Sequence, residues 1–156
     1  MWKRKIWHII PVLFAVLNQA AAKEFLSNSI LNLDNSPDYL VGNYVSFLED
    51  KVGLDYNNVL KLYQEGHFQP LGHERLFNQG YTESLWWFAF RIKNTLEKEN
   101  MVIFSPVGAS IREGILYIFD DQEQLTNKQY SGFLYGGNKR PLKSRIVSYE
   151  IHLEAG

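Results

Sequence analysis

The sequence predicts an all-β fold, an antiparallel sandwich or barrel that carries one short helix. From residue 67 onward, apolar and polar residues alternate with a period of two in several short segments, and turn-forming residues separate these segments. Apolar residues make up 46% of the 156-residue chain and aromatic residues 15%, enough to fill the core of one domain.

The first 22 residues have the three parts of a secretory signal peptide. Basic residues at 3–5 precede a twelve-residue apolar run at 6–17, and three alanines follow at 20–22. The run is shorter than the about 20 apolar residues that a membrane-spanning helix needs. We therefore expect cleavage after Ala22 and export to the periplasm or another extracytoplasmic compartment, with an uncleaved, membrane-anchored form as the alternative.

Charge and cysteine content exclude several classes of protein. The formal net charge is −1, and removal of three basic residues with the signal peptide gives −1 − 3 = −4. A chain of this charge has no basic surface for nucleic acid, so we expect no nucleic-acid partner. The absence of cysteine excludes disulfides and thiolate metal ligands. We expect no cofactor and no bound metal.

The N-terminal third is predicted to contain two strands and the helix. Residues 23–39 form a polar leader with at most one short strand, at "ILNL", and residues 40–50 alternate as a strand does. In "LDYNNVLKLYQEG", Asp55 is a good N-cap, Leu54 can pack onto Val59, and Gly66 suits the helix exit. The apolar stripe of this two-turn helix consists of Val59, Leu60 and Tyr63.

The segment 83–94, "ESLWWFAFRIKN", places two tryptophans side by side in a predicted strand. Neighbouring side chains of a strand point to opposite faces. Trp86 is in phase with the apolar set Phe88, Phe90 and Ile92, so we expect it in the core. Trp87 is in phase with Ala89, Arg91 and Lys93, and on this outer face it either lines a ligand cleft or seats a covering loop. The alternative is that the helix or a loop buries both faces.

Three more segments complete the predicted sheets. "MVIFSPV" is a strand, and "ILYIFDDQEQLT" is a strand that runs into a hairpin turn at Asp120 and Asp121. "FLYGGNKRPLK" is a glycine-rich loop. In "SRIVSYEIHL" the residues predicted to face inward are Val147, Tyr149, Ile151 and Leu153, and those predicted to face outward are Ser148, Glu150 and His152.

The chain offers no constellation for catalysis. It has no nucleophile elbow, zinc-protease motif or phosphate-binding loop. The carboxylates of a glycoside hydrolase must face each other across about 5–9 Å. The acidic pairs Glu49/Asp50 and Asp120/Asp121 are adjacent in sequence, so they diverge in a strand, and we interpret them as solvated turn residues. We expect no catalytic residue and no enzyme activity.

Aromatic residues are in surplus, with 23 Phe, Trp and Tyr in the chain. Trp87 shares its predicted face with Arg91, and Tyr117 lies on the strand at 115–119. Tyr130, Phe133 and Tyr135 flank the glycine-rich loop. Flat rings beside hydrogen-bonding side chains suit sugars and other amphipathic ligands.

The order "GYTESLWWFAFRIKNT", "IREGILYIFDDQEQL" and "KRPLKSRIVSYEIHL" resembles the type 2 extracellular domain of bacterial seven-transmembrane receptors with diverse intracellular signalling modules (7TMR-DISM). The opening "YVSFLEDKVGLDYNNVLKL" is also similar, so the resemblance covers residues 40–156. It implies a jelly-roll sandwich related in shape to carbohydrate-binding modules and exported to the periplasm. In such receptors this domain precedes seven membrane helices and an output module.

Several positions match the family motifs one by one. Gly80, Tyr81, Thr82 and Trp87 match its G-Y-T-x-S-x-x-W stretch, Tyr117 matches its L-Y strand, and Arg140, Pro141 and Arg145 match its R-P-x-x-H-R stretch. The chain departs from the family at Ala89, where arginine is common, and at Ser144, where histidine is common. With Arg91 added from the face of Trp87, the candidate ligand-binding residues are Trp87, Arg91, Tyr117, Arg140 and Arg145.

These observations predict a signal peptide at 1–22, a leader at 23–39 and a sensor-type jelly roll at 40–156. The family continues beyond the position of Gly156, so we expect the last strands to be missing and the 145–153 strand to have an open edge, through which a homodimer forms. The expected function is non-enzymatic binding of a carbohydrate or another small ligand, with a seven-transmembrane receptor or another signalling protein as partner. The alternative is a carbohydrate-binding or adhesion module unconnected to signalling.

Overall fold

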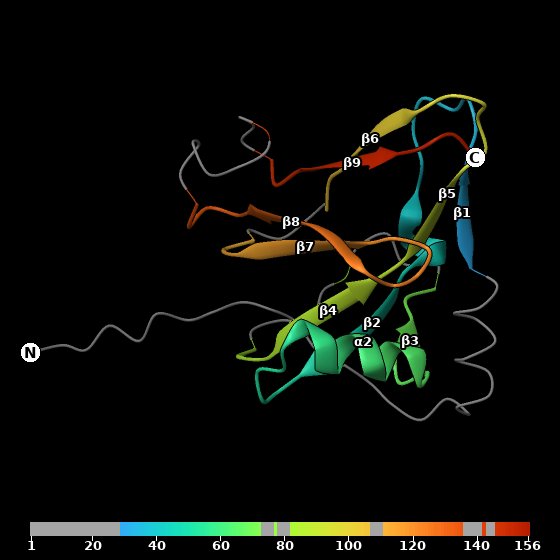
Figure 1. The fold of residues 1–156 in the computed structure, drawn as a ribbon. Coiled ribbons are helices and arrows are strands. Elements are labelled where there is room, and N and C mark those ends of the chain that lie inside the picture. Colours follow the sequence, from blue (N-terminus) through green and yellow to red (C-terminus); the bar gives the residue numbers. More distant parts are fainter. Residues whose placement is uncertain (1–28, 73–76, 78–81, 107–110, 136–141, 143–145) are drawn as a thin grey trace, which may run out of the picture. The chain divides into compact units, whose positions relative to one another are not determined.

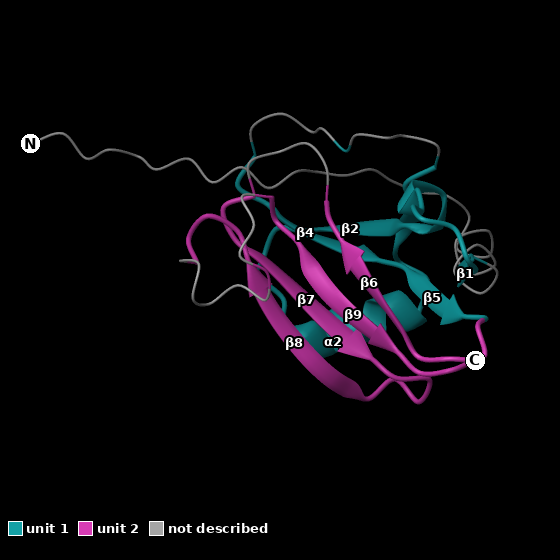
Figure 2. Cartoon of the chain, turned by 90° about the horizontal axis from the view of Figure 1, so that it is seen from above, with its two compact units in different colours: residues 1–95 teal, residues 96–156 magenta. Residues whose placement is uncertain are grey.

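The computed structural model describes residues 29–72, 77, 82–106, 111–135, 142 and 146–156. The predicted signal peptide lies outside the described residues, as do Arg140 and Arg145. The chain divides into two compact units, Met1–Thr95 and Leu96–Gly156, which Figure 2 shows in different colours. Each unit is described by itself below.

The predicted fold class is confirmed. The described residues form nine strands in four sheets, with one α-helix and one 3₁₀ turn (Figure 1). Each sheet is small, with two or three strands. The jelly-roll strand order that the family resemblance implies stays a prediction.

The first unit is built on a three-stranded antiparallel sheet. Strand β2 (Ser46–Asp50) pairs with β3 (Gln69–Pro70) on one side and with β4 (Leu85–Ala89) on the other. The predicted strand at "ILNL" is also present, as β1 (Ile30–Leu33). It pairs in parallel with β5 (Arg91–Asn94), and its Leu31 and Leu33 are buried.

The predicted strand at residues 40–50 forms only in its second half. Residues Val41–Tyr44 make a 3₁₀ turn, η1, and β2 begins at Ser46. The backbone N–H of Val45 donates to the carbonyl of Gly42 at 3.3 Å and closes this turn. Gly42 and Asn43 explain the difference, because glycine and asparagine are poor strand formers and good turn formers.

Helix α2 (Tyr56–Gln64) forms as its local signals predict. The carboxylate of Asp55 accepts a hydrogen bond from the Asn58 N–H at 2.9 Å, which is N-cap geometry. Gly66 follows the helix with φ +80°, a conformation that suits glycine. Val59 is buried against Phe68, and the half-buried residues packed around these two are Leu48, Leu54, Tyr63, Trp87 and Ala89.

The tryptophan segment consists of two strands. Strand β4 ends at Ala89 and pairs with β2, whereas β5 begins at Arg91 and pairs with β1. Phe90 lies between them, so the alternation predicted across residues 86–93 is interrupted. The prediction that Trp87 lies on a face outside the core is wrong, because it packs against the Val59–Phe68 cluster. Helix α2 thus covers the face of β4 on which Trp87 lies. This agrees with the alternative prediction that the helix or a loop buries both faces of the strand.

The second unit contains two antiparallel strand pairs. Strand β6 (Asn100–Phe104) pairs with β9 (Tyr149–Leu153), and β7 (Gly114–Phe119) pairs with β8 (Leu125–Ser131). The predicted hairpin turn is confirmed: a side-chain oxygen of Asp120 accepts hydrogen bonds from the N–H groups of Gln122 and Gln124, both at 2.9 Å.

Strand β9 alternates as predicted, with Tyr149 and Ile151 buried and His152 exposed. Ser148 just before it is an exception: predicted to face outward, it is buried at 6% exposure and its hydroxyl lies 2.9 Å from that of Ser105. Pairing of the two hydroxyls satisfies both groups, which makes burial tolerable.

The main chain of β9 is also held from the side opposite β6. The Gln129 side chain of β8 donates to the carbonyl of Glu150 at 2.5 Å and accepts from its N–H at 3.0 Å. One amide thus satisfies both backbone groups of Glu150 where a further strand would otherwise pair.

Candidate functional site

The indole of Trp87 is fixed by a carboxylate and by an apolar cluster. Its Nε1–H donates to Oδ2 of Asp50 at 3.2 Å, and the ring packs in the cluster of Val59 and Phe68 beneath helix α2. Leu48, its direct partner across the β2–β4 pair, belongs to the same cluster. Trp87 therefore has a packing role, and its predicted ligand contact stays a prediction.

Asp50 is buried at 2% exposure and is surrounded by hydrogen-bond donors. One oxygen accepts from the N–H groups of Val52 and Gly53 at 2.9 and 2.8 Å, and the other accepts from the Leu54 N–H at 2.7 Å and from Trp87. Burial alone raises the pKa of Asp50, but the hydrogen bonds from Val52, Trp87, Leu54 and Gly53 outweigh burial, so the net pKa is lowered. Asp50 thus organises the loop that leads into helix α2.

Glu49 projects to the other face of β2, as predicted for adjacent residues of a strand. Its side chain is only 2% exposed, so the interpretation of Glu49 and Asp50 as solvated turn residues is wrong. The Ser84 hydroxyl donates to Oε1 of Glu49 at 2.6 Å. Lys51 Nζ lies 2.8 Å from Oε2, at ion-pair distance but outside hydrogen-bond geometry.

Trp86 is the direct cross-strand partner of Glu49 and packs among aromatic rings. Its ring centroid lies 4.9 Å from that of Phe77 and 5.9 Å from that of Phe47. Its Nε1–H is buried without a hydrogen-bond partner in the described part of the chain. Among the described residues, the Trp87 N–H thus has a hydrogen-bond acceptor and the Trp86 N–H does not.

Two predicted ligand residues, Trp87 and Arg91, are both linked to the Val59–Phe68 cluster. The Arg91 guanidinium lies 5.8 Å from the centroid of the Tyr63 ring, a cation–π arrangement, and Tyr63 also packs in the cluster that contains Trp87. Arg91 is exposed at the start of β5. Helix α2 therefore connects the two side chains that the sequence predicts on one face.

Tyr117 belongs to an exposed group of side chains in the second unit that we call the tyrosine platform. It stands directly opposite Lys128 across the β7–β8 pair. Lys128 Nζ lies 5.0 Å from the ring centroids of both Tyr117 and Tyr130, and the Tyr130 ring lies 5.5 Å from that of Tyr135. The platform consists of Tyr117, Lys128, Tyr130 and Tyr135.

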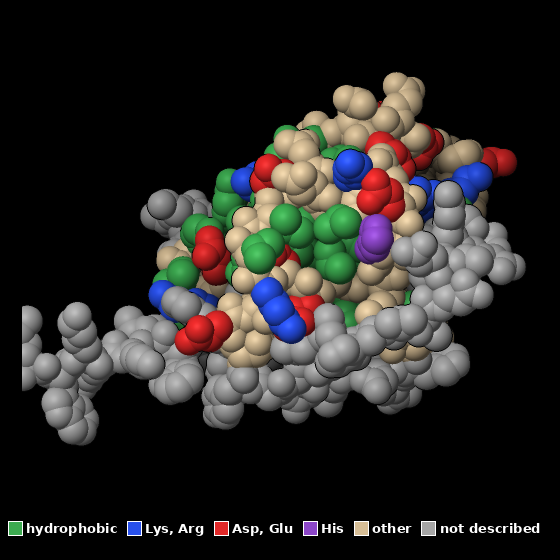
Figure 3. All heavy atoms as spheres, turned by 90° about the horizontal axis from the view of Figure 1, so that it is seen from below, with side chains coloured by type: hydrophobic (Ala, Val, Ile, Leu, Met, Phe, Trp, Pro, Cys, Tyr) green, Lys and Arg blue, Asp and Glu red, His purple; other side chains and the backbone are tan. Residues whose placement is uncertain are grey.

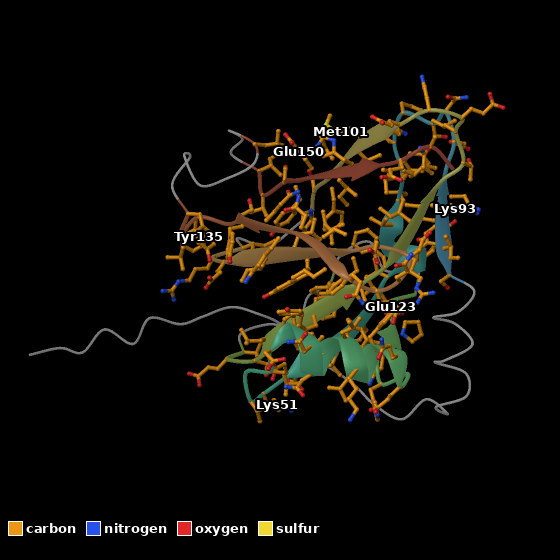
Figure 4. The ribbon with its side chains drawn as sticks, in the orientation of Figure 1. Lys51, Lys93, Met101, Glu123, Tyr135 and Glu150 are labelled. Atoms are coloured by element: carbon orange, nitrogen blue, oxygen red, sulfur yellow. The ribbon has the colours of Figure 1, made fainter. Side chains whose placement is uncertain are left out.

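The platform is held in shape at the end where Tyr135 lies. Figure 4 shows Tyr135 and Glu123 at opposite ends of the β7–β8 hairpin. The chain turns back after β8 at Gly132, with φ +111°, and the Tyr135 hydroxyl donates to the carboxylate of Glu113. This hydrogen bond is the main cause that raises the pKa of Tyr135 to about 12. A hydrogen bond with the Tyr130 side chain raises the pKa of Lys128, which favours its charged form.

The sequence predicts Tyr117 as a site residue but misses Lys128. The sequence contained a signal for Lys128. Counting back from the predicted hairpin turn along both strands places residues 117 and 128 close to one another. A register shift between Ile118 and Phe119 decides which residue stands opposite Tyr117, and no local pattern marks this shift. Trp87 and Arg91 lie in the first unit and Tyr117 in the second, so a shared cleft stays a prediction.

The described residues provide no metal site beside the Trp87 region or the tyrosine platform. On the face that Figure 3 shows, acidic and basic side chains of the described residues are interspersed. No group of three or more His, Cys, Asp or Glu among the described residues is arranged to hold a metal ion. In the same residues, no helix has the length and apolar character that crossing a membrane requires.

Comparison with known proteins identifies one family. A family model described as 7TMR-DISM extracellular 2 matches residues 42–156, which is 115 of the 156 residues. No curated protein and no solved structure matches the chain.

Proposed function

Because the chain belongs to the 7TMR-DISM extracellular 2 family, we propose that it is a ligand-binding sensory domain that recognises a carbohydrate on its tyrosine platform. Family membership makes it an extracytoplasmic sensor domain associated with a seven-transmembrane receptor. Beyond what family membership gives, we propose that the chain binds a ligand and that this ligand is a carbohydrate. We also propose that the chain is periplasmic and that it carries a signal peptide.

The tyrosine platform is the observation that carries this proposal. Tyr130 is 36% exposed, Lys128 is exposed, and Tyr117 and Tyr135 are half-buried beside them. Sugars present an apolar C–H face and a rim of hydroxyls, so aromatic rings and hydrogen-bonding groups on one surface match both parts of a sugar. Binding alone is enough for a sensor, and the proposal assigns no catalytic role to these residues.

The other predicted residues receive supporting roles. For the first unit taken by itself, we propose that Arg91, exposed and held over Tyr63, is a ligand-binding residue, and that Trp87 orients this region through Asp50. Arg140 and Arg145 are proposed as further donors. Homodimer formation through strand β9 also stays a proposal, and it would require the Gln129 amide to release the main-chain groups of Glu150.

A thermal-shift screen of the chain beginning at Lys23 tests the proposal. The panel contains neutral oligosaccharides, uronic-acid oligosaccharides and small organic acids. A ligand that binds only the folded state at about 100 times its Kd stabilises that state by about 2.7 kcal/mol, which raises the melting temperature. We expect at least one saccharide to produce this rise.

Two variants show whether the platform binds the ligand. Tyr117→Ala should abolish the saccharide-induced rise. Met101→Ala is the control, because Met101 is a large, 50% exposed side chain on strand β6, outside the platform. It should keep the rise. If no saccharide shifts the melting temperature, or if Tyr117→Ala responds like the natural chain, the proposal fails.

A further inference from the structure

We infer that the tyrosine platform selects saccharides that carry a carboxylate, and that Lys128 is the residue that recognises this charge. The inference rests on the proposed function, because it names the class of ligand that binds the same surface. The observation behind this inference is that the ammonium group of Lys128 lies near the rings of both Tyr117 and Tyr130.

Lys128 is held in place by two aromatic rings. The β7–β8 pairing sets it opposite Tyr117, and its Nζ lies at the same distance, 5.0 Å, from the Tyr117 and Tyr130 rings. Among the residues that the structure describes, Lys128 has no ion-pair partner. The carboxylate that borders the platform, Glu113, accepts its hydrogen bond from Tyr135 instead.

A held lysine is a better recognition group than a freely moving one. Long side chains lose rotamer freedom when they bind, and this loss weakens binding. The two rings already restrict Lys128 before a ligand arrives. The ammonium group keeps a donor for a carboxylate, because it has three N–H groups and its two tyrosine neighbours, Tyr117 and Tyr130, are uncharged.

The surroundings of Lys128 fit a uronic acid. The exposed ring of Tyr130 can cover the C–H face of a sugar while the carboxylate of that sugar binds the ammonium group of Lys128. Hydrogen bonds between charged partners are about twice as strong as neutral ones, so a carboxylate should be favoured over a hydroxymethyl group or an ester at that position. A single lysine is sufficient for one carboxylate but not for a polyphosphate.

Calorimetric titration with matched ligands tests the inference. The probes are oligogalacturonides and oligoglucuronides, each compared with its methyl ester, which has the same sugar rings without the charge. We expect one of the acids to bind the natural chain about tenfold more tightly than its ester, which corresponds to about 1.4 kcal/mol. The difference should shrink at high salt, because ions screen exposed charges.

Three variants separate the charge of Lys128 from the fold. Lys128→Gln should remove the preference for the acid, and Lys128→Arg should keep it. Lys93→Gln is the control, because Lys93 is an exposed lysine on strand β5 of the first unit (Figure 4), and it should keep the preference. Thermal melts of all three variants establish that each is folded before the titration.

The outcomes distinguish the inference from the proposed function. If ester and acid bind equally, or if Lys128→Gln keeps the preference, the inference is overturned while carbohydrate binding stands. If neutral and acidic saccharides all fail to bind the natural chain, the proposed function fails together with the inference.

Discussion

The indole N–H of Trp87 lies 3.2 Å from a carboxylate oxygen of Asp50, and the two residues belong to adjacent antiparallel strands 37 positions apart in sequence. On the opposite face of the same strands, Ser84 donates to Glu49. Glu49 and Asp50, neighbours on β2, therefore each accept a hydrogen bond from a side chain in or next to β4. Ser84 and Trp87 are both positions of the G-Y-T-x-S-x-x-W motif, which gives that motif a structural role in this chain.

The first prediction compares the two tryptophans. Trp87→Phe keeps an aromatic ring but removes the donor to Asp50, so the free energy of unfolding should fall by about 1.5–3 kcal/mol, typical of a hydrogen bond to a charged group. Trp86→Phe is the control, because no residue that the structure describes accepts a hydrogen bond from the Trp86 N–H. Urea unfolding of both variants measures the difference. An equal or larger loss for Trp86→Phe contradicts the assignment.

The second prediction concerns pH. The pKa of Asp50 is lower in the folded chain than the usual 3.8, so its contribution to stability is present above that value and is lost as pH falls toward the folded-state pKa. Urea unfolding between about pH 6 and pH 3 should show a decline for the natural chain near and below pH 4, and a flatter profile for Asp50→Asn.

Asp34→Asn is the control for this pH experiment. Hydrogen bonds from Ser36 and Tyr39 also lower the pKa of Asp34, but this carboxylate is exposed, so its loss should change the profile less. If Asp50→Asn follows the natural profile throughout, Asp50 does not stabilise the fold through its ionised form.

The third prediction tests the turn that returns Tyr135 to the platform. Gly132 has φ +111°, and a Cβ placed there would lie 2.6 Å from the carbonyl oxygen of Arg112. Gly132→Ala should therefore destabilise the chain by more than the about 1–2 kcal/mol that a left-handed backbone conformation costs an alanine. Gly72→Ala is the matched control, because Gly72 has φ +73° and open space around it. Equal melting temperatures of the two variants would contradict the steric account.

The fourth prediction concerns the edge of β9. Gln129 satisfies both main-chain groups of Glu150, and its removal leaves them free to pair with another chain. Gln129→Ala should therefore increase self-association, measured by sedimentation velocity over a range of concentrations. Gln122→Ala, in the exposed turn, is the control. An unchanged oligomeric state in Gln129→Ala would show that this amide does not protect the edge.

Local signals predicted the elements that depend on neighbouring residues. Helix α2 follows from Asp55, Val59 and Gly66, which lie within twelve residues of one another, and the β7–β8 hairpin follows from its turn at Asp120. Each of these elements forms hydrogen bonds that close within the segment itself, so the sequence pattern carries the necessary information.

Non-local pairing explains what the sequence did not reveal. The burial of Glu49 and Asp50 depends on donors that arrive from β4, and the packing of Trp87 depends on where helix α2 lies over the sheet. The break at Phe90 arises because β4 and β5 pair with different strands. Strand alternation describes one strand at a time and does not say which partner covers which face.

The most direct test of the account is a residue-resolved map of saccharide binding by NMR. Oligogalacturonide is titrated into isotope-labelled chain beginning at Lys23, and the backbone amide signals are followed. The account predicts that the largest shifts occur at Tyr117, Lys128, Tyr130 and Tyr135, and that they disappear in Tyr117→Ala. Shifts confined to other residues, or no shifts with this or any other saccharide of the screening panel, would contradict the claim that the tyrosine platform is a carbohydrate-binding surface.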